Sequence, residues 1–152
     1  MIYYEDVVVG AVARFGNYSV TREEVTAFAG KYDPQPFHLS DEAAAKTHFG
    51  RLSASGWHTG AMTMRMMVDH MATEQRASLG SPGIENLRWV KPVYPGDTLR
   101  CEMETVGKRR SASRTDMGLT FGHFRVFNQH DVLVMTMEST GLIAVRDPGT
   151  PD

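Results

Sequence analysis

The stretch that decides the fold is the longest helical pattern in the sequence, residues 60–79, GAMTMRMMVDHMATEQRASL. Apolar side chains recur in it at the spacing of one helix face. They are Met62, Met66, Met67, Val68, Met71 and Ala72. Arg65, Asp69 and Glu74 interrupt the apolar run, so the segment is not a membrane span. Because thioether side chains adapt to irregular surfaces, this stripe indicates a helix that packs against a core.

The residues after this helix change to a period of two from Pro82 onward, which predicts strands. Apolar and charged residues alternate over 87–89 and 99–104, and apolar strands follow at about 121–126 and 132–145. Three turn signals separate these strands: Gly96-Asp97, Gly107-Lys108 and Asn128-Gln129-His130-Asp131. The sequence therefore predicts about four antiparallel strands after the long helix.

A strand and a short helix are predicted near the start of the chain. The strand covers residues 12–20, and Thr21 with Glu24 then forms the pattern of a capping box. The helix that follows ends at about Lys31.

A second short helix is predicted after Ser40, which is a suitable N-cap. Asp41 and Glu42 stand where the positive end of the helix dipole favours carboxylates, so we interpret both as structural. The order of elements is a strand, two short helices, a long helix and four strands. That order predicts the α+β class, with an antiparallel sheet wrapped on one long helix.

Length and composition fit one ordinary globular domain, which we place at residues 1–145, followed by a flexible tail at 146–152. A net charge of −2 gives no attraction to nucleic acid or to an anionic membrane. The one cysteine, Cys101, cannot form an intrachain disulfide and is expected in the core. No Cys/His cluster has the spacing of a metal site. The N-terminus has no signal-peptide pattern, so a cytoplasmic location is expected.

Acid–base groups and backbone constraint are concentrated in Tyr32-Asp33-Pro34-Gln35-Pro36-Phe37-His38. Each proline fixes its own φ and pushes the preceding residue towards an extended conformation. Such stiffness suits a pair of catalytic groups, since misplacement by about 1 Å can cost on the order of 10²-fold in rate. The alternative is a proline-rich turn that only connects two helices.

This stretch, continuing through Leu39 and Phe49 to Ser55-Gly56, resembles the hydratase motif D-x-N-P-x-H of the MaoC-like family, which includes the (R)-specific enoyl-CoA hydratases. A second block, residues 89–99, WVKPVYPGDTL, is similar to the family's strand–turn–strand segment. The resemblance implies the hotdog fold. It also implies a homodimer or higher homo-oligomer in which two sheets join edge to edge.

The resemblance implies roles for particular residues. Asp33 and His38 match the catalytic acid–base pair, which would hold a water molecule between them. The backbone N–H of Gly56 would donate to the thioester oxygen, because helix N-termini favour developing negative charge. Gln35, Ser55 and Trp57 are expected to contact the substrate. Coenzyme A is then part of the substrate, and neither a separate cofactor nor a metal is expected.

Three positions depart from the family's pattern. Gln35 stands where the motif has asparagine, Ser55 where a histidine commonly precedes the glycine, and Met64 where a serine is often found. Each departure bears on the substrate pocket, and none removes the acid–base pair.

A basic cluster, Lys108-Arg109-Arg110 with Arg114, falls in a predicted hairpin connection. It is either a solvated loop or a contact for the phosphates of coenzyme A. The imidazoles of His58 and His70 are interpreted as capping or interface groups.

The function that follows is an (R)-specific enoyl-CoA hydratase or 3-hydroxyacyl-CoA dehydratase, which adds or removes water across the 2,3-double bond of an acyl thioester. Two other classes stay open. A hotdog acyl-CoA thioesterase would direct water at the carbonyl carbon, and a non-catalytic acyl-CoA-binding subunit would keep the fold and lose the pair. The presence of both Asp33 and His38 favours the hydratase.

Overall fold

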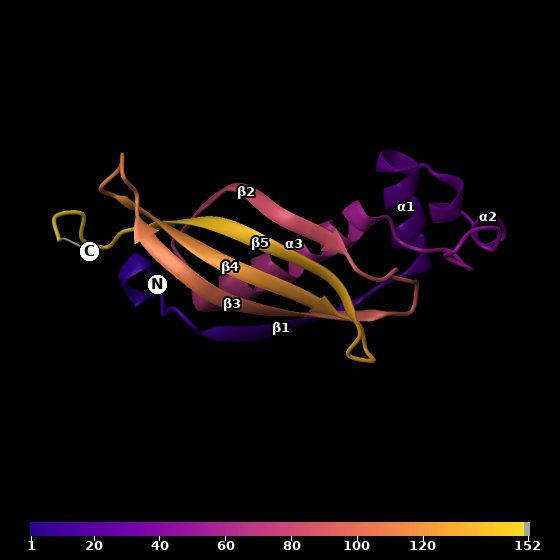
Figure 1. The fold of residues 1–152 in the computed structure, drawn as a ribbon, viewed down its shortest axis with the longest axis horizontal. Coiled ribbons are helices and arrows are strands. Elements are labelled where there is room, and N and C mark those ends of the chain that lie inside the picture. The colour runs from indigo at the N-terminus through magenta and orange to yellow at the C-terminus, as the bar shows by residue number, and fades with distance from the viewer. Residues whose placement is uncertain (151–152) are drawn as a thin grey trace.

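A computed structural model describes residues 1–150 and contains one five-stranded antiparallel sheet with a long helix packed on it (Figure 1). The strands are β1 (Val12–Ser19), β2 (Ser78–Trp89), β3 (Thr98–Arg110), β4 (Met117–Phe127) and β5 (Leu133–Ala144). Their order in the sheet is β1-β3-β4-β5-β2, so β1 and β2 form the two edges. The predicted class and order of elements are confirmed.

The helices are α1 (Arg22–Tyr32), α2 (Asp41–Ala44) and α3 (Gly56–Glu74), with single 3-10 turns η1 (Tyr4–Asp6) and η2 (Pro36–His38). Helix α3 starts and ends earlier than the predicted 60–79. It ends because Gln75 takes a left-handed conformation with φ 52°. Strand β2 therefore begins before Pro82, which it accommodates because it is an edge strand.

One predicted turn is wrong. Gly107 and Lys108 lie inside β3, where the register with β4 shifts between Thr105 and Gly107 as in a β-bulge. The hairpin connection lies at 111–116 instead. The other two turns are confirmed: residues 90–97 join β2 to β3, and Asn128 Oδ1 accepts hydrogen bonds from two backbone amides in the β4–β5 turn.

The core lies between α3 and one face of the sheet. Met62 and Met66 of the helix stripe are buried against residues of the inner strands. Those residues include Leu99, Cys101, Phe124, Val126, Val134 and Met135. Val68 and Ala72 are exceptions to the predicted stripe, because both are exposed. Burial raises the pKa of the Cys101 thiol to about 12, so Cys101 is an inert core residue, as predicted.

Strand β1 bends around the helix at Gly16. The register with β3 shifts between Phe15 and Tyr18, and Gly16 has φ 91°. A Cβ at Gly16 would collide with the Met66 side chain. Glycine therefore supplies both the left-handed conformation and the space for close packing on α3.

Both short helices have the predicted N-caps. The Thr21 hydroxyl accepts from the Glu24 N–H, although the Glu24 carboxylate binds the Tyr18 hydroxyl and leaves the capping box half formed. The Ser40 hydroxyl accepts from the Ala43 N–H at 3.2 Å. Asp41 accepts from the Leu52 N–H and pairs with Arg22, so its structural role is confirmed.

The chain termini meet at the end of the sheet away from α1 and α2 (Figure 1). Glu5 accepts from the backbone N–H of Arg146 and from that of Asp147, so the start of the expected flexible tail is anchored. The last two residues of that tail, 151–152, lie outside the described residues. Within residues 1–150, no helix is both long enough and apolar enough to span a membrane.

Candidate active site

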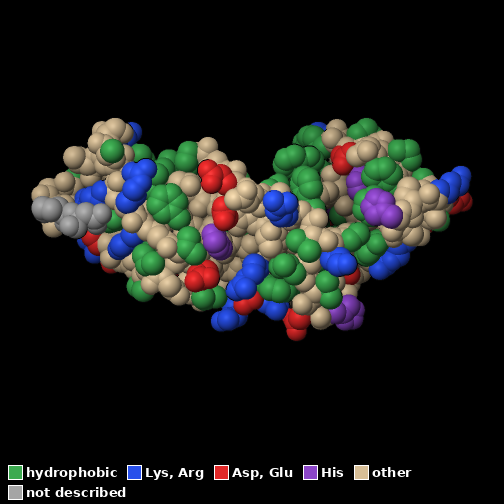
Figure 2. Space-filling view, in the orientation of Figure 1, with side chains coloured by type: hydrophobic (Ala, Val, Ile, Leu, Met, Phe, Trp, Pro, Cys, Tyr) green, Lys and Arg blue, Asp and Glu red, His purple; other side chains and the backbone are tan. Residues whose placement is uncertain are grey.

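A cavity of about 570 Å³ lies between the sheet and the α1–α2 region, where the surface is visibly hollowed (Figure 2). Four segments surround it: the loop after α1, η2, the loop into α3, and the connection from β2 to β3. The lining residues include Asp33, Gln35, Phe37, His38, His48, Phe49, Ser55, Gly56, Trp57, Trp89 and Lys91.

Asp33 is placed by the end of α1. Its N–H donates to the Ala29 carbonyl at 2.9 Å, which closes the last turn of the helix. Pro34 has no N–H and cannot continue the helix, so the chain leaves with Asp33 at φ −150° and ψ 67°. The Gln35 N–H then donates back to the Asp33 carbonyl at 2.8 Å. The loop is thus fixed by prolines and hydrogen bonds together.

His38 is placed by η2 and is almost fully buried. Its Nδ1 lies 2.7 Å from the carbonyl oxygen of Ser53. Because a carbonyl oxygen can only accept, Nδ1 carries a proton. Nε2 is then the atom that faces Asp33, 3.5 Å from Oδ2. That separation is too long for a good direct hydrogen bond.

The Asp33 carboxylate accepts two short hydrogen bonds from neutral donors. Gln35 Nε2 lies 2.7 Å from Oδ1, and Ser55 Oγ lies 2.7 Å from Oδ2. Burial by itself raises the pKa of Asp33, but these two hydrogen bonds and the neighbouring His38 together hold that pKa below its usual value. Asp33 is therefore an anion at neutral pH.

The N-terminus of α3 opens into the same cavity. Ser55 is the N-cap residue, yet its hydroxyl makes no capping hydrogen bond and instead donates to Asp33 Oδ2. An N-cap hydrogen bond is usually worth about 1 kcal/mol, and α3 forgoes it. Gly56 is the first helical residue and lines the cavity. Its end of the helix favours negative charge.

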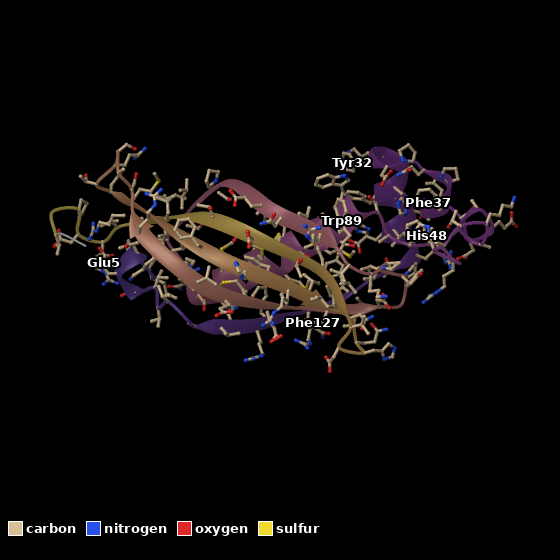
Figure 3. All side chains as sticks on the ribbon, viewed as in Figure 1. Glu5, Tyr32, Phe37, His48, Trp89 and Phe127 are labelled. Atoms are coloured by element: carbon tan, nitrogen blue, oxygen red, sulfur yellow. The ribbon has the colours of Figure 1, made fainter. Side chains whose placement is uncertain are left out.

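Trp89 is a site residue that the sequence analysis did not single out. Its indole ring lies directly against Gly56, where a Cβ would collide with it. Trp57 meets the same ring edge to face, with centroids 5.2 Å apart. Trp89 is the last residue of β2, on the side of the sheet that lies next to the α1–α2 region (Figure 3). Glycine at position 56 is thus required by packing as well as by the motif.

His48 and Lys91 were also missed, and both line the cavity. Lys91 is the one lysine or arginine among the lining residues. It belongs to the block at 89–99 that the resemblance treats as scaffold, so its side chain carried no separate signal. His48 follows α2 and precedes Phe49, but it is not one of the motif positions, and only the fold brings it to this wall.

The structure brings most of the predicted site residues together and leaves the basic cluster apart. Asp33, Gln35, His38, Ser55, Gly56 and Trp57 all line one cavity. Lys108, Arg109 and Arg110 lie in β3 rather than in a hairpin connection. Lys108 donates to the Tyr4 carbonyl, and Arg110 pairs with Glu5 at the end of the molecule opposite His48 (Figure 3). Arg114 pairs with Asp116 in that hairpin.

His58 packs beneath the site rather than in it. Its ring stacks on Phe28 of α1, with centroids 4.7 Å apart, so it is an interface residue between α1 and α3. Among the described residues, no partner accepts from or donates to its buried Nδ1. Burial lowers the pKa of His58, and the nearby Glu24 carboxylate only partly offsets this. His70 likewise stacks on Phe15.

Comparison with known proteins identifies the family. The model of the MaoC-like domain matches residues 7–124. The solved structure of the MaoC-like dehydratase from Rhodospirillum rubrum is 35% identical, with a TM-score of 0.86, and the match covers 97% of this chain and 99% of that one. The (R)-hydratase from A. caviae involved in PHA biosynthesis is 26% identical, with a TM-score of 0.70 over 90% of this chain and 97% of that one.

A shorter match links the chain to a named hydratase. The mesaconyl-CoA hydratase of Cereibacter sphaeroides is 33% identical over 64 residues, which are 42% of this chain and 18% of that protein. The matches confirm the resemblance on which the site was predicted, and the hotdog fold with it. The chain belongs to the MaoC-like dehydratase family, whose relatives include hydratases and dehydratases.

Proposed function

We propose that this protein is an (R)-specific enoyl-CoA hydratase, or 3-hydroxyacyl-CoA dehydratase in the reverse direction. The observation that carries the proposal is the meeting of Asp33 Oδ2 and His38 Nε2, 3.5 Å apart, in a cavity that the N-terminus of α3 also lines. An acid–base pair beside unpaired helix amides is what hydration of a conjugated thioester requires.

The attacking water would sit between the two side chains. With its proton on Nδ1, the His38 imidazole offers a lone pair at Nε2, and the Asp33 carboxylate offers another at Oδ2. Two acceptors this close are joined by one water molecule that donates a hydrogen to each, about 2.8 Å from both. The water oxygen then presents a lone pair to C3 of the substrate. This arrangement explains why the two atoms lie beyond direct hydrogen-bond distance.

The reaction would proceed through an enolate-like state. The water oxygen bonds to C3, the electron pair of the 2,3-double bond moves towards the thioester carbonyl, and one member of the pair takes the water's proton. The Gly56 N–H donates to the carbonyl oxygen while it carries negative charge. A proton from the pair then adds to C2, which completes the 3-hydroxyacyl thioester. Dehydration runs the same steps backwards.

The relatives support the reaction class and the kind of carrier. One of them is described as an (R)-hydratase and another as a mesaconyl-CoA hydratase. Phe37, Phe49, Trp57 and Trp89 give the cavity apolar walls that suit an acyl group.

We also propose a homodimer, because β2 leaves apolar surface exposed at a sheet edge. Leu79, Ile84 and Trp89 of β2 are each about half exposed, as are Met64 and Val68 of α3. Edge strands with exposed apolar residues are usually covered by pairing. Light scattering at micromolar concentration should give twice the monomer mass, and a monomer would contradict this part of the proposal.

A panel of trans-2-enoyl-CoA thioesters of different chain length and branching tests the proposed reaction. The enoyl absorbance should fall without release of free thiol. Thiol release at the same rate would identify a thioesterase instead. Binding without loss of enoyl absorbance for any thioester would identify a non-catalytic acyl-CoA-binding subunit.

A further inference from the structure

Two of the three departures from the family's pattern converge on one side chain. Gln35 replaces the motif asparagine and Ser55 replaces a histidine, and in the structure both donate to Asp33. Gln35 Nε2 binds Oδ1 and Ser55 Oγ binds Oδ2, each at 2.7 Å. Both residues were expected to contact the substrate. Their donor atoms are instead used on the predicted catalytic carboxylate.

We propose that Ser55 and Gln35 are positioning residues that clamp the Asp33 carboxylate as an anion, with Oδ2 turned towards His38. The clamp holds one oxygen from each side, so the carboxylate cannot rotate about its last torsion without breaking both hydrogen bonds. The inference rests on the proposed function for its kinetic consequences and on geometry alone for the clamp.

The behaviour of Ser55 at the helix terminus supports a dedicated role. Serine at an N-cap normally accepts from an amide in the first turn of its helix. Ser40 does this at the start of α2, where its hydroxyl accepts from the Ala43 N–H. Ser55 has the same position in α3, is completely buried, and directs its hydroxyl to Asp33 instead. Of these two N-cap serines, Ser40 caps its helix and Ser55 binds the Asp33 carboxylate.

The clamp also leaves the Gly56 end of α3 open. A capping hydroxyl would accept from the amide of the second or third helical residue, next to the Gly56 N–H that the proposed function assigns to the thioester oxygen. The Ser55 side chain holds the carboxylate, and it makes no capping hydrogen bond at the start of α3. This links the two halves of the site through a single residue.

The groups around Asp33 allow the clamp to be tested by titration. His38 of η2 is the titratable group that faces Asp33, and Ser55 and Gln35 supply neutral donors from the α3 and α1 sides. His48 and Lys91 line the cavity, but among the described residues neither pairs with Asp33. A variant that removes one donor should therefore change the protonation of Asp33 directly.

The variants are Ser55→Ala, which deletes the hydroxyl, and Gln35→Met, which keeps the length of the side chain and deletes the amide. Gln35 is exposed, so its replacement leaves packing intact and keeps the test informative where Ser55→Ala folds poorly. Ser40→Ala is the matched control, since it deletes an N-cap hydroxyl that does cap its helix. Gln35→Glu, which replaces a donor by a like charge, should act in the same direction as Gln35→Met and more strongly.

Carboxyl carbon NMR of protein labelled at aspartate, with Asp33→Asn used to assign the signal, measures the Asp33 titration without substrate. The midpoint should move to higher pH in Ser55→Ala and in Gln35→Met and stay in place in Ser40→Ala. The acid limb of kcat/KM for an enoyl-CoA thioester should move the same way. A kcat loss of about tenfold is expected from the looser carboxylate.

An unchanged Asp33 midpoint in folded Gln35→Met and Ser55→Ala protein would overturn the clamp, as would an equal change in Ser40→Ala. If the wild-type protein hydrates no thioester, the proposed function fails on the kinetic measurement, and the NMR titration still decides whether the clamp exists.

Discussion

At each end of the molecule an aromatic ring packs against a glycine, close to an acidic residue. The partners of the acidic residue differ between the two ends. At the end where the termini meet, the Tyr4 ring lies against Gly118, and Glu5 pairs with Arg110 at 3.3 Å. At the cavity end, the Trp89 ring lies against Gly56. The acid there, Asp33, accepts from a hydroxyl and an amide and faces an imidazole at 3.5 Å instead of a guanidinium.

The difference in partners distinguishes Glu5, a structural acid, from Asp33, the candidate catalytic acid. The Arg110 guanidinium offsets the charge of Glu5 at Oε1, and the Arg146 backbone N–H binds Oε2. A hydroxyl and an amide hold the Asp33 carboxylate in place and leave its negative charge for a water molecule and a proton. Among the described residues, no lysine or arginine pairs with Asp33. The candidate site is therefore distinguished by the Asp33 carboxylate, which keeps its negative charge beside the His38 imidazole.

Replacing Asp33 at one end and Glu5 at the other tests this distinction with the largest expected effect. Asp33→Asn keeps the shape and deletes the charge, so kcat should fall by about 10²-fold or more while the thermal midpoint moves by a few degrees at most. Glu5→Gln should do the reverse, lowering the melting temperature with kcat unchanged. Steady-state kinetics and thermal melts of both variants check this. Equal loss of kcat in the two variants would remove the distinction between the ends.

Much of the fold and the loop at the candidate site were predictable from the sequence, because their signals are local. The stripe of α3 and the alternation of β3 depend on periodicity, and the Asp33–His38 loop depends on its prolines. The extent of α3 was predicted less well, because Gln75 ends it in a left-handed conformation that a side chain does not announce. Likewise, Gly107 has the composition of a turn but forms a bulge, because the pairing of β3 with β4 continues past it.

The contacts between distant segments could not be predicted. Trp89 meets Gly56 because the end of β2 passes beside the start of α3, and no local pattern encodes that approach. Lys91 and His48 reach the cavity for the same reason. The donors on Asp33 were predicted as site residues but with other partners. A motif can predict that a residue lies at the site. Which group that residue hydrogen-bonds depends on tertiary packing, which the motif does not encode.

The second test uses Gly56 and Gly118, the glycines that lie against an aromatic ring at each end of the molecule. Adding a methyl group at either position forces an aromatic ring to move, and overpacking typically costs about 1–3 kcal/mol. Gly118→Ala should therefore lower the melting temperature by several degrees and leave kcat of the folded fraction unchanged. Gly56→Ala should lose stability and, in addition, at least about tenfold in kcat, because it displaces an amide that faces the substrate. Circular dichroism melts and kinetics separate the two effects.

The two ends should also respond to acid over different pH ranges. The pKa of His58 lies below its ordinary value of 6.5, so the unfolded chain binds this proton more readily than the folded one. The contribution of neutral His58 to the free energy of unfolding is therefore fully present above about pH 6.5, and it is lost as the pH drops below that value. Burial raises the pKa of Glu5, but its backbone hydrogen bonds and the charge of Arg110 outweigh that effect and hold the pKa below its ordinary value of 4.5. Its contribution is lost only below about pH 4.5.

Urea unfolding at several pH values measures both slopes. The variant His58→Gln should flatten the dependence between pH 7 and pH 5, and Glu5→Gln should leave that interval as it is. A wild-type slope that His58→Gln does not change would show that another group titrates there.

The smallest effect is expected from the basic residues at the two ends. Lys91 lines the cavity and is exposed, so Lys91→Ala should raise KM for a CoA thioester by up to about fivefold, in the range of a solvent-exposed ion pair. The rise should shrink at high salt. Arg109→Ala should leave KM unchanged. A larger rise for Arg109→Ala would restore the basic cluster of β3 as a phosphate contact.

The central claim is that Asp33 and His38 act as one acid–base unit, and a double-mutant cycle on hydration of an enoyl-CoA thioester tests it most directly. The measurement compares kcat for wild type, Asp33→Asn, His38→Ala and the double variant, with melting temperatures alongside. Each single change should lower kcat by about 10²-fold or more, and the double change should be little worse than the worse single one. Hydration that persists in both single variants while they melt much earlier would show that the loop is structural.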